Sequence, residues 1–220
     1  MENIVYYFLI VFGAILVWIS CNDLRKLKEN NAQWAEIEQQ SHLYKQDNYE
    51  EAEKLVKKLQ KIIPFLAKFS LLNGVFAIVG SLLGLVGLFN NINLNLYYVG
   101  YISIIVLFLS VMGIFSLAFG MIKTNSTGIA IFIRFNNRYK LALEYIVSNS
   151  IYDLQVFFEE YVDDNYKIIQ IPGTSIIGEA DYIECVILKF IFLLFFNISV
   201  LLICLSFFFN PEFHHMIMKF

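Results

Sequence analysis

Charged side chains are missing from four long parts of this sequence. Residues 4–21, 69–89, 97–122 and 190–209 contain no Asp, Glu, Lys or Arg, and each stretch has at least 18 residues. A helix of about 20 apolar residues crosses the hydrocarbon core of a bilayer, which is about 30 Å thick. The hydrophobic share of 58% also exceeds the roughly 45–50% that is typical of soluble domains. The sequence therefore predicts an all-α integral membrane protein with four transmembrane helices and excludes a soluble fold.

Residues that carry chemistry are also scarce. The spans hold no acidic residue of the kind that proton relays and coupled transporters need, and the chain has no P-loop, HExxH or GxSxG motif. Residues 214–218 mix histidine and methionine, which suits a soft metal, yet no third fixed ligand is evident. We therefore expect no enzymatic activity, no cofactor and no metal site. Three cysteines, an odd number without a C-x-x-C pair, predict no disulfide framework: Cys21, Cys185 and Cys204.

The connectors between the spans differ in charge. The short connector, residues 90–96, carries none, whereas residues 22–61 contain eight basic residues and residues 123–182 contain five. Basic residues beside membrane spans are retained on the cytoplasmic side. We therefore expect both long connectors in the cytoplasm and both termini outside. The abundance of Ile, Asn, Phe, Tyr and Lys is typical of an AT-rich coding sequence and favours the plasma (inner) membrane of a prokaryote.

This topology predicts a chain of six parts. Each part is either a membrane-spanning segment with its flanks or a region on one side of the membrane. The outward tail is short enough to need no fixed structure. Two alternatives remain open around Pro172 and Gly173 in the second cytoplasmic region, namely a small strand hairpin and a loop packed on the helices. The parts are residues 1–21 (N-terminus and first span), 22–61 (cytoplasmic helical hairpin), 62–122 (transmembrane hairpin with outer loop 90–96), 123–182 (mostly helical cytoplasmic lid), 183–209 (fourth span) and 210–220 (outward tail).

The first cytoplasmic connector has the pattern of two amphipathic helices joined by a turn at residues 46–48. Apolar residues recur on one face of each helix, and Asn48 with Glu51 has the spacing of a capping box. Ala52 and Pro64 match the pattern of the second half of a tetratricopeptide repeat, which the segment resembles. A repeat array needs about three copies, and we find no second one. We therefore expect a single helical hairpin that binds a cytoplasmic protein through Trp34, Ile37, Tyr44 and Tyr49.

Basic residues near the ends of the spans are expected to bind anionic lipid headgroups. A long basic side chain can extend to the headgroups even when its backbone lies about one turn inside the bilayer. Each such cation contributes about 1 kcal/mol near an anionic surface. The residues predicted to do so are Arg25, Lys26, Lys28, Lys68, Arg134, Arg138 and Lys189.

Small residues recur at one-turn spacing in the second and third spans, and one asparagine interrupts the fourth. Small residues let helix backbones approach closely in lipid, where no hydrophobic force drives helices together. The amide of the asparagine must find a partner on another helix or on another copy of the chain. Packing within one chain and packing between subunits both remain open. The predicted helix-packing or oligomer interface consists of Gly80, Gly84, Gly87, Gly113, Gly120 and Asn197.

Three functional classes remain. We expect first a non-enzymatic, membrane-anchored assembly or signalling component that binds a cytoplasmic protein and associates with itself. The second class is an oligomeric pore or membrane-perturbing effector, for example in antiviral (phage) defence, and the third is a membrane protein that confers immunity to a toxin. Acidic residues equal or outnumber basic residues in both cytoplasmic connectors. We therefore expect membrane lipids and proteins as partners, and no direct binding of nucleic acid.

Overall fold

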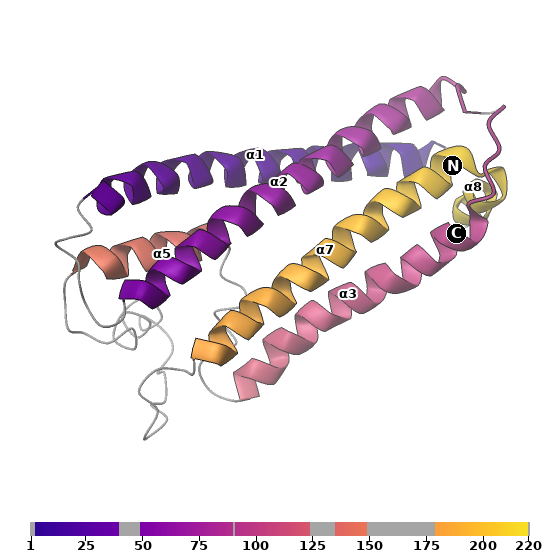
Figure 1. Cartoon of the computed structure of the whole chain (residues 1–220). Helices are drawn as coiled ribbons and strands as arrows, with labels where there is room; N and C mark the ends of the chain where they lie inside the picture. Colours follow the sequence, from indigo (N-terminus) through magenta and orange to yellow (C-terminus); the bar gives the residue numbers. More distant parts are fainter. Residues whose placement is uncertain (1–2, 40–48, 90, 124–134, 149–178, 220) are drawn as a thin grey trace. The chain divides into compact units, whose positions relative to one another are not determined.

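The computed structural model describes residues 3–39, 49–89, 91–123, 135–148 and 179–219. No β-strand is present in these ranges, and the strand hairpin considered around Pro172 and Gly173 lies outside them. The helices within the ranges, labelled in Figure 1, are α1 (Ile4–Gln39), α2 (Tyr49–Leu85), α3 (Tyr97–Lys123), α5 (Phe135–Ser148), α7 (Glu179–Phe209) and α8 (Pro211–Met218).

Four of these helices, α1, α2, α3 and α7, are long and apolar enough to cross a membrane. The coarse prediction of a helical chain with four candidate membrane spans is therefore confirmed for the described residues. With 36 and 37 residues, α1 and α2 are much longer than the roughly 20 residues that a bilayer needs. Pro64 lies inside α2 without ending it.

The chain divides into two compact units. Unit 1 consists of Met1–Asp23, Phe65–Gly113 and Ile191–Phe220, and unit 2 consists of Leu24–Pro64 and Ile114–Phe190. Each unit therefore contains part of each of the four long helices, together with α8 in unit 1 and α5 in unit 2.

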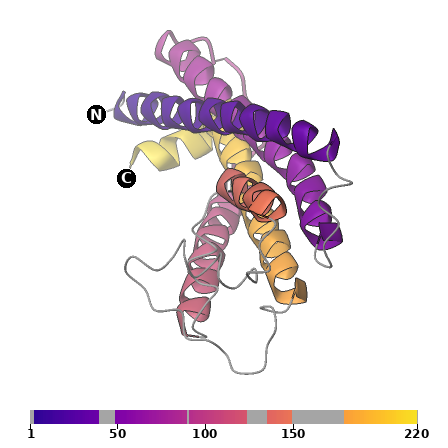
Figure 2. The ribbon, with the colours of Figure 1, turned by 90° about the vertical axis from the view of Figure 1, so that its left-hand side faces the viewer.

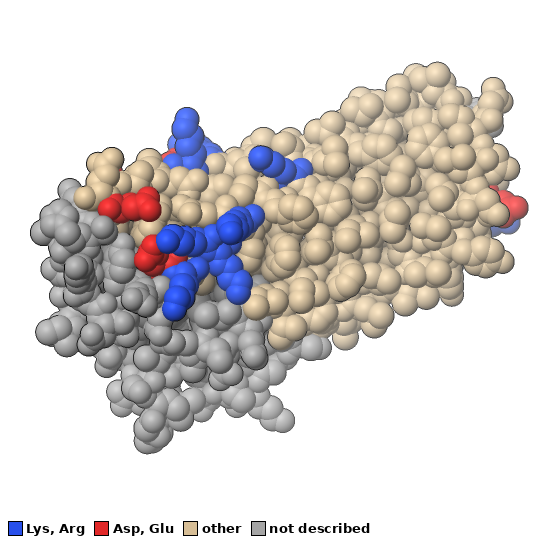
Figure 3. Space-filling view, in the orientation of Figure 1, with Lys and Arg blue, Asp and Glu red and all other residues tan. Residues whose placement is uncertain are grey.

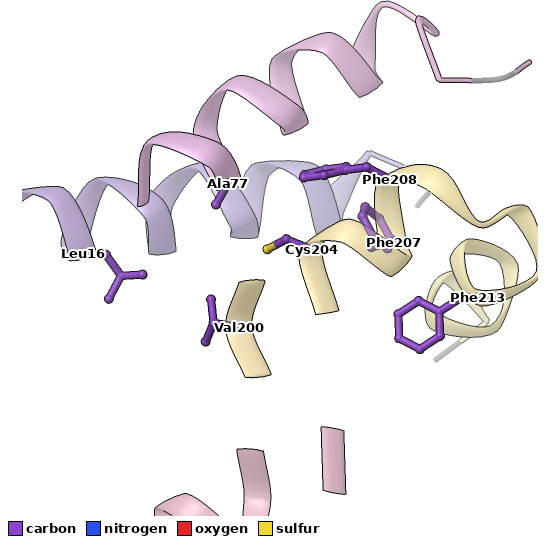
Figure 4. Packing of buried hydrophobic residues seen from close by; sticks show 7 residues of the cluster. All are labelled: Leu16, Ala77, Val200, Cys204, Phe207, Phe208 and Phe213. Carbon is purple, nitrogen blue, oxygen red and sulfur yellow. The ribbon is translucent and has the colours of Figure 1, made fainter. Parts of the chain in front are cut away.

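The core of unit 1 is built mainly from aromatic and aliphatic side chains of α7. The ring of Phe208 packs against the rings of Phe76 and Phe89, with centroids 5.7 Å apart in both pairs. Helices α1, α2 and α8 add one residue each to the buried cluster. Figure 4 shows its members, Leu16, Ala77, Val200, Cys204, Phe207, Phe208 and Phe213.

Two glycines bring the backbones of α1 and α2 into contact in unit 1. A Cβ atom on Gly13 would lie 2.7 Å from the carbonyl oxygen of Gly74, and a Cβ atom on Gly74 would lie 2.7 Å from the carbonyl oxygen of Gly13. Neither position has room for a side chain, because the neighbouring atom belongs to the backbone. Close approach at small residues is a principal way in which helices associate in lipid.

The C-terminus of α2 is completed by Gly87, whose φ of 74° lies in the left-handed region. Its N–H donates to the carbonyl of Gly84 at 2.9 Å, and the N–H of Leu88 donates to the carbonyl of Leu83 at 3.2 Å. These two bonds form the Schellman pattern of helix ends, in which glycine is strongly favoured. Gly87, which its spacing grouped with the packing glycines, therefore has the role of ending the helix.

Large apolar side chains cover the outside of unit 1. Phe8, Val11 and Trp18 on α1, and Tyr98 and Phe108 on α3, are each at least 60% exposed. Large apolar side chains that are exposed in such numbers mark a contact with lipid or with another protein. It agrees with the assignment of these helices as candidate membrane spans.

The residues after α7 form helix α8, so the expectation of a tail without fixed structure is corrected. The side-chain oxygen of Asn210 accepts a hydrogen bond from the N–H of Phe213 at 2.6 Å, which caps the helix. The side-chain amide of Asn210 donates to the carbonyl of Leu94 at 2.8 Å. Pro211 stands in the first turn, where its fixed φ suits a helix. Because Phe213 is fully buried, α8 is packed against the rest of unit 1, beside the beginning of α3 (Figure 1).

Unit 2 joins its parts of α1 and α2 to helix α5. Figures 1 and 2 show α5 beside these parts of the two longer helices. Val56, Leu59, Tyr139 and Leu143 have no exposed surface, so side chains of α2 and α5 form the centre of this core. The other apolar residues of unit 2 that the structure describes as buried are Leu27, Trp34, Ile37, Ile62, Ile63 and Ala142.

The contact between Gly13 and Gly74 generates a prediction about stability. We expect Gly74→Ala to lower the free energy of unfolding by about 1–3 kcal/mol, because the new methyl group meets a backbone carbonyl that cannot rotate away. Reversible unfolding by SDS in mixed micelles, followed by circular dichroism, measures this loss. Val75→Ala, at a position that is 45% exposed, is the control and should change stability by less than about 0.5 kcal/mol. Equal losses in the two variants would contradict the close contact.

Candidate functional site

The interior of unit 1 contains a hydrogen-bonded pair of asparagines. The side-chain amide of Asn73 on α2 donates to the backbone carbonyl of Asn197 at 2.8 Å and to its side-chain oxygen at 3.2 Å. The amide of Asn197 donates to the carbonyl of Leu193 at 2.8 Å. Asn73 is 1% exposed and Asn197 is 5% exposed. The partner that Asn197 requires is thus supplied within the chain, by a residue that the sequence analysis did not single out.

Some buried side-chain oxygens of unit 1 accept and donate no hydrogen bond within the described residues. The side-chain oxygen of Asn73 and the hydroxyls of Ser20 and Ser81 have no hydrogen-bond partner among the described residues. The buried polar side chains that the structure describes in unit 1 are all Asn or Ser. These amides and hydroxyls can form hydrogen bonds with another helix or with a water molecule. They do not ionise near neutral pH, so they do not serve as general acids or bases.

Serines at seven-residue spacing mark the buried faces of α3 and α7. Ser103 and Ser110 are both 3% exposed and donate to the carbonyls of the residues four positions earlier, at 2.6 and 2.7 Å. Ser199 and Ser206 on α7 have the same spacing and are 1% and 0% exposed. Gly100, one turn from Ser103, meets Ser206 where its Cβ would stand. The seven-residue spacing of serines in both helices is therefore a sequence signal that could have predicted the contact between α3 and α7.

The structure places the predicted packing glycines against side chains of the same chain. A Cβ atom on Gly80 would collide with the ring of Phe208, and one on Gly84 would collide with the ring of Tyr6. Gly113 makes the same kind of contact with Phe192. Gly120 lies in α3, but its surroundings are outside the part of the chain whose side chains are described.

The two histidines of α8 lie at an aromatic cluster. The ring of His214 stacks on Phe207 with centroids 4.6 Å apart, and it lies 5.8 Å from the ring of Tyr6. His215 is 6.0 Å from His214, with the two rings nearly perpendicular. Among the described residues, no three His, Cys, Asp or Glu side chains gather in a group that could hold a metal ion.

Unit 2 contains a polar junction of three helices around Tyr139 of α5. The hydroxyl of Tyr139 donates to the side-chain oxygen of Asn31 on α1 at 2.9 Å and accepts from the amide of Gln60 on α2 at 2.8 Å. A further bond, 3.1 Å long, runs from the amide of Asn30 to the backbone carbonyl of Asn136. We call Asn30, Asn31, Gln60, Asn136 and Tyr139 the three-helix junction.

The pKa of Tyr139 is raised to about 12, chiefly by burial. The hydrogen bond from Gln60 acts to lower this pKa, and the nearby carboxylate of Glu38 acts to raise it. The phenol is therefore neutral at physiological pH and serves as a hydrogen-bonding group. Nothing in the sequence pattern of the first connector pointed to this tyrosine, which lies more than 100 residues after Asn31.

The residues predicted to bind a partner fall into two groups. Trp34 and Ile37 are 5% and 3% exposed, so both side chains lie in the core of unit 2 rather than on its surface. Tyr44 lies outside the described residues, and Tyr49 begins α2 but its side chain is not described. The apolar face of the first connector therefore already packs within this chain.

The predicted headgroup ligands differ in their surroundings. Arg25 is exposed and pairs with Glu29 at 3.2 Å, while Lys28 and Lys68 are exposed and Lys26 is partly exposed. Figure 3 shows that basic and acidic side chains gather in one region of the surface in view, and that most of the remaining described surface there carries no charge. Arg134 and the side chain of Arg138 lie outside the described residues.

Lys189 differs from the expectation that its side chain reaches the headgroups. It is 9% exposed, and its ammonium lies 5.0 Å from the centroid of the Phe135 ring. The attraction between a cation and an aromatic face contributes about 0.5–2 kcal/mol and grows with desolvation. The structure therefore gives Lys189 a contact between α7 and α5 inside unit 2.

Tyr139 generates a prediction about stability. We expect Tyr139→Phe to destabilise unit 2 by about 1–3 kcal/mol, because Asn31 and Gln60 lose the hydroxyl between them. Hydrogen exchange of the α5 amides measures the loss, and Glu36→Gln, at an exposed position of α1, is the control. Unchanged protection of α5 in Tyr139→Phe would contradict a stabilising junction.

The variant Tyr139→Phe also isolates the effect of Tyr139 ionisation on the pH dependence of the stability of unit 2. The pKa of Tyr139 is higher in the folded chain, about 12, than the ordinary value of 10.0, so deprotonation favours the unfolded form. This contribution to stability is complete below pH 10.0 and is lost as the pH rises toward about 12. Wild-type α5 should therefore lose protection over this range more steeply than α5 in Tyr139→Phe. Parallel pH profiles would contradict the role of the phenol.

No family model matches the chain, and no curated protein or solved structure is significantly similar to it. Its function is therefore inferred from the residues and contacts described above.

Proposed function

We propose that this protein is a non-enzymatic, membrane-anchored assembly or signalling component. Unit 1 is held in a prokaryotic plasma (inner) membrane, and unit 2 binds a protein partner in the cytoplasm. The observation that carries the proposal is the contrast between the units. The described interior of unit 1 offers only Asn and Ser as polar groups. Unit 2, by contrast, has a hydrogen-bonded core to which α1 and α2 contribute the residues that exceed the length of a membrane span.

The distribution of charge supports a cytoplasmic location of unit 2. Arg25, Lys26 and Lys28 lie within two turns of the apolar part of α1, flanked by Asp23 and Glu29, whereas Glu36 and Glu38 come later in the same helix. At 1.5 Å per residue, the two groups are roughly 15 Å apart along the axis. Cations next to a span favour retention on the cytoplasmic side, and there they meet anionic headgroups.

Self-association is part of the proposal. Only 11% of the apolar window of α1 and 17% of that of α3 are buried within the chain. The rings of three aromatic residues of the same chain already pack on the glycines that were predicted as an interface. Phe208 packs on Gly80, Tyr6 on Gly84 and Phe192 on Gly113. A second copy would therefore pack on the exposed aromatic faces of α1 and α3, in competition with lipid.

An oligomeric pore is the second candidate function. It is favoured by the buried oxygens of Asn73, Ser20 and Ser81, which have no partner among the described residues and which water in an opened bundle would satisfy. Ion leakage from liposomes that contain the purified protein would favour the pore over a partner-binding component.

Site-specific photocrosslinking in intact cells tests the proposed function. A benzophenone amino acid replaces Glu36 or Lys54, which are exposed in unit 2, and replaces Phe8 as the control on the apolar surface of unit 1. We expect the two positions in unit 2 to give the same discrete adduct with a second protein, and Phe8 to give adducts with lipid or with another copy of the chain. Absence of a protein adduct from both positions in unit 2 would contradict the proposal.

A further inference from the structure

One side of α2 in unit 2 is lined by lysines. Between Glu53 and Pro64, the buried positions are all aliphatic and belong to the core of unit 2: Val56, Leu59, Ile62 and Ile63. Every exposed position in the same stretch is a lysine, at intervals of three and four residues, so these side chains share one side of the helix. Together with one partly exposed neighbour they form what we call the lysine face: Lys54, Lys57, Lys58 and Lys61.

Most of the charge on the lysine face is not neutralised within the described chain. Lys57 pairs with Glu53 in the preceding turn. Among the described residues, Lys54, Lys58 and Lys61 have no ion-pair partner. Figure 3 shows basic side chains gathered over this part of α2. Like charges on neighbouring turns repel one another, so the lysine face favours an anionic partner.

The order of charges along α2 favours a lipid surface as that partner. The acidic residues of α2, Glu50, Glu51 and Glu53, all come before Lys54. From Lys54 to the charge-free stretch that begins at residue 69, no acidic residue occurs, and Lys68 adds a further cation. A cluster of four to eight basic residues directly on the cytoplasmic side of a membrane span is typical of a segment that binds anionic lipid headgroups. An acidic soluble protein, by contrast, would not require the lysines to lie next to the span.

Distance along α2 separates the lysines of the face. The charge-free stretch of residues 69–89 is about 31 Å long as a helix, which matches a hydrocarbon core of about 30 Å. In a helix along the bilayer normal, Lys61 and Lys58 then lie roughly 12 and 16 Å beyond the edge of this core, and Lys54 lies roughly 22 Å beyond it. The headgroup layer is about 5–8 Å thick, and the surface potential falls off over a further 8–10 Å or so. Lys61 and Lys58 are therefore within reach of the headgroups, whereas Lys54 is not.

We propose that Lys58 and Lys61 bind the phosphate groups of anionic phospholipids in the cytoplasmic leaflet. Each ammonium group has three N–H donors for phosphate oxygens. Lys57 keeps Glu53 as its partner, and Lys54 stays in water outside the headgroup layer. The inference goes beyond the proposed function by assigning a lipid class to α2, and it rests on that function only for the leaflet in which these lipids lie.

Chemical labelling of lysines tests the contact in the full-length chain. The purified protein is placed in nanodiscs of phosphatidylcholine or of phosphatidylglycerol, and acetylation by a neutral N-hydroxysuccinimide ester is followed at each lysine by mass spectrometry. A lysine bound to phosphate stays protonated and reacts slowly. We expect Lys58 and Lys61 to react about three- to fivefold more slowly in phosphatidylglycerol. Lys54, on the same side of the same helix, is the internal control and should change by less than about twofold.

Two results of this labelling would overturn the inference. One is an equal rate at Lys58 and Lys61 in the two kinds of nanodisc. The other is equal slowing at Lys54, because a contact with headgroups depends on distance from the span. A salt concentration of about 1 M, which shortens the screening length to about 3 Å, should abolish the slowing at Lys58 and Lys61, and slowing that persists would also count against the contact.

Matched variants provide a second measurement. Lys61→Gln and Lys54→Gln remove the same charge from the same side of α2. Native mass spectrometry of the detergent-solubilised chain, titrated with phosphatidylglycerol, measures the affinity for the lipid. We expect Lys61→Gln to weaken binding about three- to fivefold and Lys54→Gln to behave as the wild type. Equal losses in the two variants would contradict a contact made by Lys61.

The labelling is independent of the photocrosslinking that tests the proposed function, because the nanodiscs contain no second substrate or partner protein. Slower acetylation of Lys58 and Lys61 in phosphatidylglycerol, without a protein adduct from Glu36 or Lys54 in cells, would support the lipid contact and contradict the proposed function. A protein adduct without any effect of phosphatidylglycerol on acetylation would overturn the inference and leave the proposed function standing.

Discussion

The constraint on which unit 1 depends is the contact between the backbones of α1 and α2 at Gly13 and Gly74. Lipid does not drive helices together by a hydrophobic force, so close packing and hydrogen bonds must hold them. Each glycine carbonyl occupies the place where a side chain of the other would stand. Further along the same two helices, Gly84 receives Tyr6, and Gly80 of α2 receives Phe208 of α7. Small residues on one helix therefore define where large aromatic rings of the others can lie.

Polar groups serve different ends in the two units. In unit 1, Asn73 and Asn197 tie α2 to α7 in surroundings that are otherwise apolar. Because hydrocarbon offers no alternative partner, such groups specify which helices meet. In unit 2, the phenol of Tyr139 is shared by side chains that have access to water. The first arrangement specifies which two helices meet in apolar surroundings, and the second joins α5 to α1 and α2 within unit 2.

Local features of the sequence predicted the spans well, because absence of charge over 18 or more residues is a property of one segment alone. The requirement of Asn197 for a partner also followed from its surroundings in the span, but the choice of Asn73 depends on how α2 and α7 meet. The role of Gly87 depends on where α2 ends. The cap of α8 was within reach of the sequence, since Asn210 and Pro211 form a standard helix start. The burial of Trp34 and Ile37, by contrast, depends on a core that includes α5, which lies about 100 residues later in the chain.

The location of unit 2 in the cytoplasm is the central claim, and labelling of single cysteines from outside intact cells tests it most directly. The background replaces Cys21, Cys185 and Cys204, and single cysteines are introduced as Lys54→Cys in unit 2 and Glu212→Cys in α8, both at exposed positions. A membrane-impermeant maleimide should label Glu212→Cys in intact cells, and Lys54→Cys only after the membrane is permeabilised. Labelling of Lys54→Cys in intact cells would place unit 2 outside and contradict the account.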